Sequence, residues 1–228
     1  MKLVIFDIDG TLTRTNEADE ACFASSVREF FKIQNVSTNW SDYEHSTDSG
    51  IIDELVRRHL GRAPMPEELA SFRDVFVRHL ENHYSSVPQS FQEVAGAASI
   101  FVELGARAKG WTPAIATGGW KRSAQLKLSK AGIPFDQIPA AFADDAFSRD
   151  EIIQKAMSRV HQKSQIEKVV YVGDGHWDFV TCQRLRIPFV GVTDTRDPKK
   201  LKSAGVKTLI QDYAQFDRFL NALESAEV

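Results

Sequence analysis

The chain has 228 residues, of which 43% are apolar and 26% are charged, and its formal net charge at pH 7 is -3. This composition is ordinary for a globular protein, and it gives no support for nucleic-acid binding through charge. Cys22 and Cys182 lie far apart without a metal-binding spacing, which argues against a zinc site or a disulfide framework. We see no signal-peptide pattern and no apolar stretch near the roughly 20 residues of a membrane span, so we expect a cytoplasmic protein that binds no membrane.

The apolar run Leu3–Phe6 predicts a buried strand, and the motif Asp7-Ile8-Asp9-Gly10-Thr11 follows it directly. In open α/β sheets, ligands bind beyond the carboxyl ends of the strands, which is where these carboxylates would lie. If the chain turns at Gly10, Asp7 and Asp9 can converge on one small volume, and a hard cation such as Mg2+ would offset their repulsion. A solvated Asp-rich turn gives the same short pattern, so the rest of the chain must decide.

The stretch from Arg14 to Gln89 contains no clear apolar strand. Its apolar residues recur at helical spacing, and Gly61–Pro66 predicts a connector between two of the helices. We therefore predict an all-helical insert at residues 14–89, within a core formed by residues 1–13 and 90–228.

Strand and helix patterns alternate in the second half of the chain. Strands are predicted at Ala114–Ala116, Ile138–Phe142, Val169–Val172, Phe189–Val192 and Lys207–Ile210. Helices are predicted at Ser123–Ala131, Glu151–Val160, Phe179–Leu185, Pro198–Ala204 and Tyr213–Leu223. Such alternation is typical of the α/β class, so we predict a Rossmann-like parallel sheet with helices on both faces.

Two of these later strands also end in polar motifs. Thr117-Gly118-Gly119 follows the strand at Ala114–Ala116, and backbone N–H groups in a glycine turn before a helix suit a phosphate oxygen. Asp174 and Asp178 follow the strand at Val169–Val172, and a helix opening there would place them one turn apart on one face.

Taken in order, these motifs resemble those of the haloacid dehalogenase-like hydrolase superfamily, in its phosphatase branch. The resemblance covers nearly the whole chain and is strongest to phosphoglycolate phosphatase-like members, which carry an α-helical cap after the first motif. It implies that residues 14–89 are such a cap, which closes over the site and selects the substrate. It further implies that Asp7 is the nucleophile, Asp9 the general acid and base, and Thr117 a hydrogen-bond partner of the phosphoryl group.

The resemblance also implies a Mg2+ cofactor. Asp7, Asp174 and the backbone carbonyl of Asp9 would bind the ion, and Asp178 would support the metal or orient its loop.

One expected feature of the family is missing, because no Lys-Pro pair stands between the second and last motifs. Arg149, at the start of a predicted helix, is our candidate for the cation that offsets the phosphoryl charge. Lys121, Arg122 and Lys155 are its rivals.

Within the predicted cap, the polar segment Tyr43–Gly50 precedes an apolar helix. Asp48 or Ser49 could cap that helix, whereas in the family the loop at this position often touches the substrate. The candidate substrate- and phosphate-binding residues are His45, Thr47, Gly118 and Gly119. Trp120 and Trp177 could line the same pocket or simply pack, and His176 could line it or be exposed.

We therefore expect a Mg2+-dependent phosphatase that acts on a small phosphorylated metabolite, as a monomer or a homodimer. Asp9 favours phosphate esters over carbon–halogen bonds, because the dehalogenases of the superfamily lack an aspartate there. A phosphoglucomutase-type phosphotransferase shares every core motif and stays an alternative. A regulatory or binding protein that has kept the fold and lost turnover is the other alternative, although the complete motif set argues against it.

Overall fold

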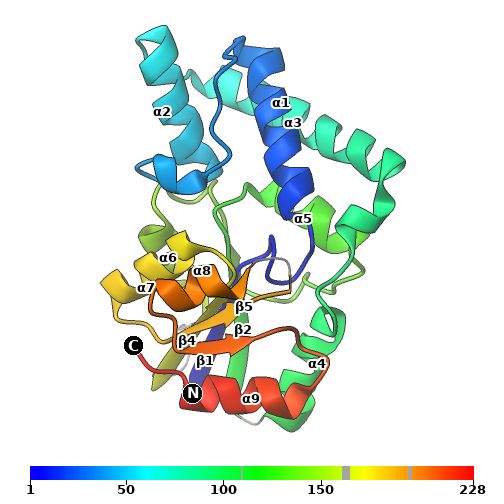
Figure 1. Cartoon of the computed structure of the whole chain (residues 1–228), viewed down its shortest axis with the longest axis vertical. Coiled ribbons are helices and arrows are strands. Elements are labelled where there is room, and N and C mark those ends of the chain that lie inside the picture. The colour runs from blue at the N-terminus through cyan, green and yellow to red at the C-terminus, as the bar shows by residue number, and fades with distance from the viewer. Residues whose placement is uncertain (109, 161–164, 195–196) are drawn as a thin grey trace.

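The computed structural model describes residues 1–108, 110–160, 165–194 and 197–228 (Figure 1). Their strands form one parallel sheet in the order β3-β2-β1-β4-β5-β6, which confirms the predicted α/β class. The strands are β1 (Lys2–Phe6), β2 (Trp111–Ala116), β3 (Ala140–Ala141), β4 (Lys168–Gly173), β5 (Phe189–Val192) and β6 (Thr208–Ile210). Every predicted strand is present, but Ile138–Phe142 is wrong in extent, because only Ala140 and Ala141 pair with β2.

The central strand β1 explains why both faces of the sheet are covered. Its side chains alternate between faces, with Leu3 and Ile5 in one buried cluster and Val4 and Phe6 in another. The first face packs against α6 (Arg149–Val160), α7 (His176–Leu185) and α8 (Pro198–Ser203). The second packs against α4 (Ala97–Arg107), α5 (Lys121–Lys130) and α9 (Phe216–Ser225). Helix α4 is absent from the sequence prediction.

The helices α1 (Asn16–Phe31), α2 (Asp48–Leu60) and α3 (Pro66–Ser86) fill the predicted insert, with the short 3-10 helices η1 (Trp40–Asp42) and η2 (Pro88–Phe91). They form the upper part of the molecule in Figure 1, and the sheet lies below them. Their apolar side chains make a third buried cluster, which also takes in Trp120 from the loop before α5. The division into a core and a 14–89 cap stays a prediction.

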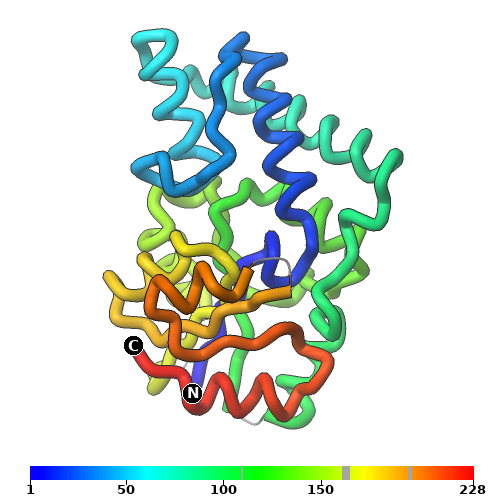
Figure 2. The backbone as a smooth tube through the Cα atoms, viewed as in Figure 1, coloured from blue at the N-terminus to red at the C-terminus, as the bar shows by residue number. Residues whose placement is uncertain are grey.

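The chain leaves the sheet after β1 and returns before α4 along two adjacent segments (Figure 2). Thr13 and Glu93 form an antiparallel bridge, the Arg14 N–H donates to the Gln92 carbonyl at 2.8 Å, and the Val94 N–H donates to the Leu12 carbonyl at 2.9 Å. The helices α1 to α3 are therefore connected to the sheet through one narrow, paired crossing. Within the described residues, no helix combines the length and apolar character needed to cross a membrane.

Phe72 of α3 is the centre of the aromatic packing among these helices. Its ring is fully buried, 5.8 Å from the ring of Phe23 and 5.7 Å from that of Trp120. We predict that Phe72→Ala lowers the free energy of unfolding by about 3–5 kcal/mol, because a large cavity replaces the ring. Val102→Ala, at a side chain that is 66% exposed, is the control and should change it by less than about 0.5 kcal/mol. Urea denaturation followed by circular dichroism measures both free energies. A loss for Phe72→Ala as small as that for Val102→Ala would contradict the central role of the Phe72 ring.

Candidate active site

The candidate site lies at the carboxyl ends of three neighbouring strands. Asp7 follows β1, Thr117 follows β2 and Asp174 follows β4, and the Asp7 N–H donates to the Val172 carbonyl at 3.0 Å. Because β1 pairs with both β2 and β4 in parallel, side chains just beyond their ends meet at one edge of the sheet. The parallel register thus brings together residues that are more than a hundred positions apart.

Gly10 makes the turn that the first motif requires. Its φ is +73°, and a Cβ at this position would lie 2.2 Å from Asp174 Oδ2 and 2.4 Å from Asn16 Nδ2. The Asn16 amide donates to Asp174 Oδ2 at 2.8 Å, so the turn, the first helix of the insert and the last motif are in direct contact. Only glycine can hold this conformation without displacing Asp174.

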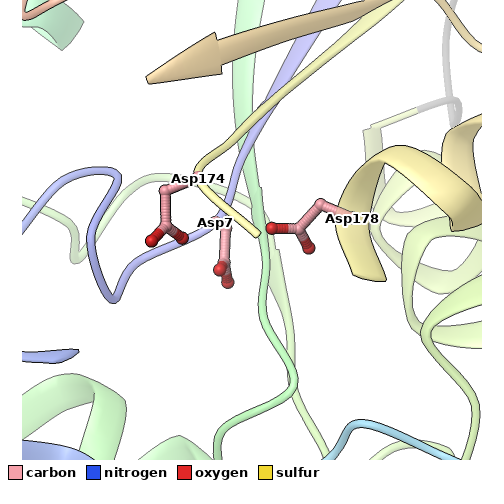
Figure 3. A group of neighbouring side chains, drawn as sticks. All are labelled: Asp7, Asp174 and Asp178. Carbon is pink, nitrogen blue, oxygen red and sulfur yellow. The ribbon is translucent and has the colours of Figure 1, made fainter. Parts of the chain in front are cut away.

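The carboxylates of Asp7, Asp174 and Asp178 converge on one small volume (Figure 3). Each offers an oxygen within 4.8 Å of the others, and all three side chains are buried. Burial raises the pKa of Asp7 above its usual value, an effect that the Arg149 guanidinium opposes. Among the described residues, Asp7 Oδ1 is a buried oxygen without a hydrogen-bond partner. Converging buried carboxylates with such an oxygen suit a hard divalent cation.

Arg149, the first residue of α6, is the cation next to Asp7. Its Nη1 lies 3.8 Å from Asp7 Oδ1 and donates to Asp178 Oδ1 at 2.7 Å, and its Nε donates to the Ser46 carbonyl at 3.1 Å. The neighbouring carboxylates of Asp178 and Asp7 raise the pKa of Arg149 even though burial opposes this. The guanidinium therefore stays charged at the floor of the site.

The rival cations lie elsewhere. The side chains of Lys121, Arg122 and Lys155 are exposed, and Arg122 pairs with Asp74.

Thr117 and the glycine turn complete the wall beside Asp7. The Thr117 side chain lowers the pKa of the Asp7 carboxyl, and its hydroxyl accepts from the Gly119 N–H at 3.3 Å. A Cβ on Gly118 would lie 2.7 Å from Arg149 Nη2 and 2.8 Å from the Ser46 carbonyl oxygen. The absence of a side chain at Gly118 is thus what allows Arg149 and the loop before α2 to approach the turn.

Asp9 is held by a lysine that the sequence analysis did not select. Lys127 Nζ, from α5, donates to Asp9 Oδ2 at 2.5 Å and to Asp19 Oδ1 of α1 at 2.8 Å. Burial opposes the charge on Lys127, but the Asp19 and Asp9 carboxylates raise its pKa. The signal was available, because Lys127 shares the buried face of α5 with Ala124 and Leu128, where a surface lysine would not lie.

The loop before α2 distributes its polar residues differently from the prediction. Thr47 caps α2, since its hydroxyl accepts from the Gly50 N–H at 3.1 Å and donates to the Phe147 carbonyl at 2.6 Å. Capping by Asp48 or Ser49 is therefore wrong. Asp48 instead accepts from the Trp120 N–H at 2.9 Å, and the Ser49 hydroxyl accepts from the Trp120 indole at 2.7 Å.

Two adjacent cavities open at the site. The inner one, of about 40 Å³, is lined by Asp7, Asp9, Thr117 and Arg149 among others. The outer one, of about 220 Å³, is lined by His45, Tyr43 and His176. Trp40, Ser46, Arg149 and Trp177 line both cavities. The predicted substrate residue His45 thus belongs to the outer cavity, while Thr47 lies on the wall of the inner one.

Comparison with known proteins agrees with this arrangement. A family model described as haloacid dehalogenase-like hydrolase matches residues 4–192. The chain belongs to this family. It is 23% identical over 218 residues to the pyrophosphatase PpaX of Oceanobacillus iheyensis, a match that covers 93% of each chain.

Two solved structures share the fold of this family member. A hydrolase from Pseudomonas syringae superposes with a TM-score of 0.73 at 19% identity, covering 97% of this chain and 98% of the other. CbbY from Rhodobacter sphaeroides, solved in complex with phosphate, gives a TM-score of 0.66 at 17% identity, covering 98% and 99%. At these identities the likeness establishes the fold.

The pair between Arg149 and Asp178 generates a stability prediction. Arg149→Met should lower the free energy of unfolding by about 3–5 kcal/mol, because it leaves a buried carboxylate without its cation. Arg149→Met/Asp178→Leu should recover part of this loss, since it removes both charges. Arg184→Met, which breaks the more exposed pair with Asp150, is the control and should cost less than about 1 kcal/mol. Equal losses in urea denaturation for Arg149→Met and Arg184→Met would contradict the buried pair.

Proposed function

We propose that this protein is a Mg2+-dependent phosphatase that hydrolyses a phosphomonoester of a small metabolite through an aspartyl-phosphate at Asp7. The observation that carries the proposal is the environment of Asp7. Its buried carboxylate lies 3.8 Å from Arg149, lines the same cavity as Thr117 and faces Asp174 and Asp178. A nucleophilic carboxylate beside a fixed guanidinium and a hydroxyl is what phosphoryl transfer requires.

The reaction would proceed in two steps. An oxygen of Asp7 attacks phosphorus, the bond from phosphorus to the leaving oxygen breaks, and Asp9 gives that oxygen a proton. A water molecule then attacks the phosphorus of the aspartyl-phosphate, Asp9 takes its proton, and the Asp7 carboxylate and inorganic phosphate are released. Arg149 and Thr117 stabilise the charge of the phosphoryl group throughout.

The metal would be held by the carboxylates of Asp7 and Asp174 and by the backbone carbonyl of Asp9. Asp178 accepts from Arg149 and, through Oδ2, from the Gly175 N–H at 3.1 Å, so it orients the guanidinium and the loop beside the metal. The Asp9 side chain points to Lys127 and Thr15 and is outside the carboxylate cluster, which leaves it available for acid and base chemistry. When bound, Mg2+ supplies charge neutralisation and orients the phosphate.

The two cavities suggest where the two parts of the substrate bind. The phosphoryl group fits the inner cavity beside Asp7, and the leaving group extends into the outer cavity of about 220 Å³. His45, Trp40 and Trp177 would contact it there. The size of this cavity favours a small metabolite.

Inorganic pyrophosphate is a second candidate substrate. It is favoured by the full-length similarity to a protein named as a pyrophosphatase. A phosphotransferase that passes the phosphoryl group to a second hydroxyl would use the same residues. Measuring free phosphate against phosphorylated acceptor, with sugar phosphates, small acid and alcohol phosphates and pyrophosphate as probes, separates these three activities.

Asp7→Asn should lower kcat by about a thousandfold or more, because the amide is a poor nucleophile. The fold should persist, since burial already disfavours the charged form of Asp7. Phosphate release from p-nitrophenyl phosphate measures the rate, and Asp136→Asn, at an exposed side chain, is the control. Retention of a substantial fraction of the wild-type rate would rule out the covalent mechanism.

Removal of the metal gives an independent test. Chelation with EDTA should abolish turnover, and Mg2+ should restore it. Asp174→Asn should raise the Kd for Mg2+ in isothermal titration calorimetry at least about tenfold, because one anionic oxygen ligand is lost. Asp136→Asn again serves as the control. Activity that survives chelation, or unchanged Mg2+ binding by Asp174→Asn, would contradict the assigned site.

A further inference from the structure

We propose that Lys127 is a positioning residue for Asp9, which it holds in place by tying the Asp9 carboxylate to Asp19 of helix α1. The inference rests on the proposed function, because it concerns the residue that exchanges protons with the leaving group and with water. It assigns a role to a buried charge that the mechanism above does not use.

The location of Lys127 calls for such a role. Its side chain is 1% exposed, and it lies on the face of α5 that also buries Ser123, Ala124 and Leu128. A lysine is almost never fully buried unless it is paired, because removing the ammonium group from water costs several kcal/mol. Its hydrogen-bond partners are Asp9 Oδ2 at 2.5 Å and Asp19 Oδ1 at 2.8 Å. A residue that only filled space at this position could be apolar, whereas an ammonium group can donate to both carboxylates at once.

The other oxygen of Asp9 is held as well. The Thr15 hydroxyl donates to Asp9 Oδ1 at 2.5 Å, and Thr13 Oγ1 lies 2.5 Å from the same hydroxyl. Both carboxylate oxygens are therefore held, one by Lys127 of α5 and one by Thr15, the residue that precedes α1. A carboxyl group held at both oxygens cannot rotate away from the substrate.

Both restraints also depend on α1. Thr15 is the residue before the helix, Asp19 lies one turn further on, and the Asp19 N–H donates to the Thr15 carbonyl at 2.7 Å. The first turn of α1 thus reaches Asp9 directly through Thr15 and indirectly through Asp19 and Lys127. The orientation of Asp9 is consequently coupled to the position of the first turn of α1 relative to α5.

If Lys127 positions Asp9, the loss of rate on replacing Lys127 should depend on the leaving group. When the bond from phosphorus to a strongly basic alkoxide breaks, that oxygen needs the proton of Asp9, and a misplaced carboxyl group slows the step. When the leaving group is a stable anion such as p-nitrophenolate, it departs without a proton. Benzyl phosphate and p-nitrophenyl phosphate are similar in size and differ in this respect, so they separate positioning of Asp9 from a general defect.

The decisive variant is Lys127→Met, which keeps an unbranched side chain, one heavy atom shorter, and removes the charge. We expect kcat/KM for benzyl phosphate to fall by about a hundredfold, within the range that general acid catalysis supplies, and kcat/KM for p-nitrophenyl phosphate to fall by less than about threefold. Lys127→Arg should retain activity on benzyl phosphate within about tenfold of the wild type. Lys130→Met is the matched control, because Lys130 lies on the same helix, is exposed and contacts the ring of Tyr84.

A separate control tests whether the loss of activity comes from a loss of stability. Lys127→Met leaves Asp19 without its cation, so Lys127→Met/Asp19→Leu is tested in parallel, with the fold of each variant checked by circular dichroism. The double variant should show the same selective loss on benzyl phosphate. Equal losses on both probes in a folded variant would overturn the proposal and assign Lys127 a structural role. Wild-type protein that hydrolyses neither probe would instead overturn the proposed function, and this inference with it.

Discussion

The structure depends on placing several carboxylates inside a small buried volume at the edge of the sheet. Two buried cations make this possible. Arg149 faces Asp7 and Asp178 on one side, and Lys127 faces Asp9 and Asp19 on the other. Each cation comes from a helix packed against a different face of the sheet, so the two faces support different halves of the site. The hydrophobic packing of α5 and α6 therefore determines where the charges lie.

Arg149 and Lys127 contact different parts of the site. Arg149 is close to Asp7, the proposed nucleophile, and contacts the loop before α2 through the Ser46 carbonyl. Lys127 lies behind Asp9 and contacts α1 through Asp19. Each charge thus links Asp7 or Asp9 to one element of the helical insert. The placement of these helices and the orientation of Asp7 and Asp9 are consequently connected through short polar contacts.

Much of the site followed from local sequence pattern combined with one topological rule. Asp7, Thr117 and Asp174 each come directly after an apolar run, and parallel strands bring such positions to the same edge. Arg149 could be identified as the cation of the site because it begins a predicted helix between the second and last motifs. No motif marks Lys127; its signal is its place beside Ala124 and Leu128 on the apolar face of α5, a face that Lys121 and Lys130 do not share.

The remaining differences have similar causes. The sequence analysis offers Asp48 and Ser49 as N-cap candidates, but Thr47 caps α2, and Asp48 and Ser49 accept from Trp120 instead. Strand β3 is shorter than its apolar run because only its end reaches β2. The sequence predicts the last helix from Tyr213, but α9 begins only at Phe216. The centre of the Tyr213 ring instead lies 6.1 Å from that of the Phe6 ring.

The narrow crossing at Thr13 and Glu93 has an evolutionary consequence. Because the chain leaves and returns at adjacent points, a different set of helices could be exchanged for α1 to α3 without altering the register of β1 and β2. Such an exchange would remove Asp19 and leave Lys127 facing Asp9 alone. Within the lineage of this protein, the insert and helix α5 are therefore expected to be inherited together, with substitutions at positions 19 and 127 occurring as pairs.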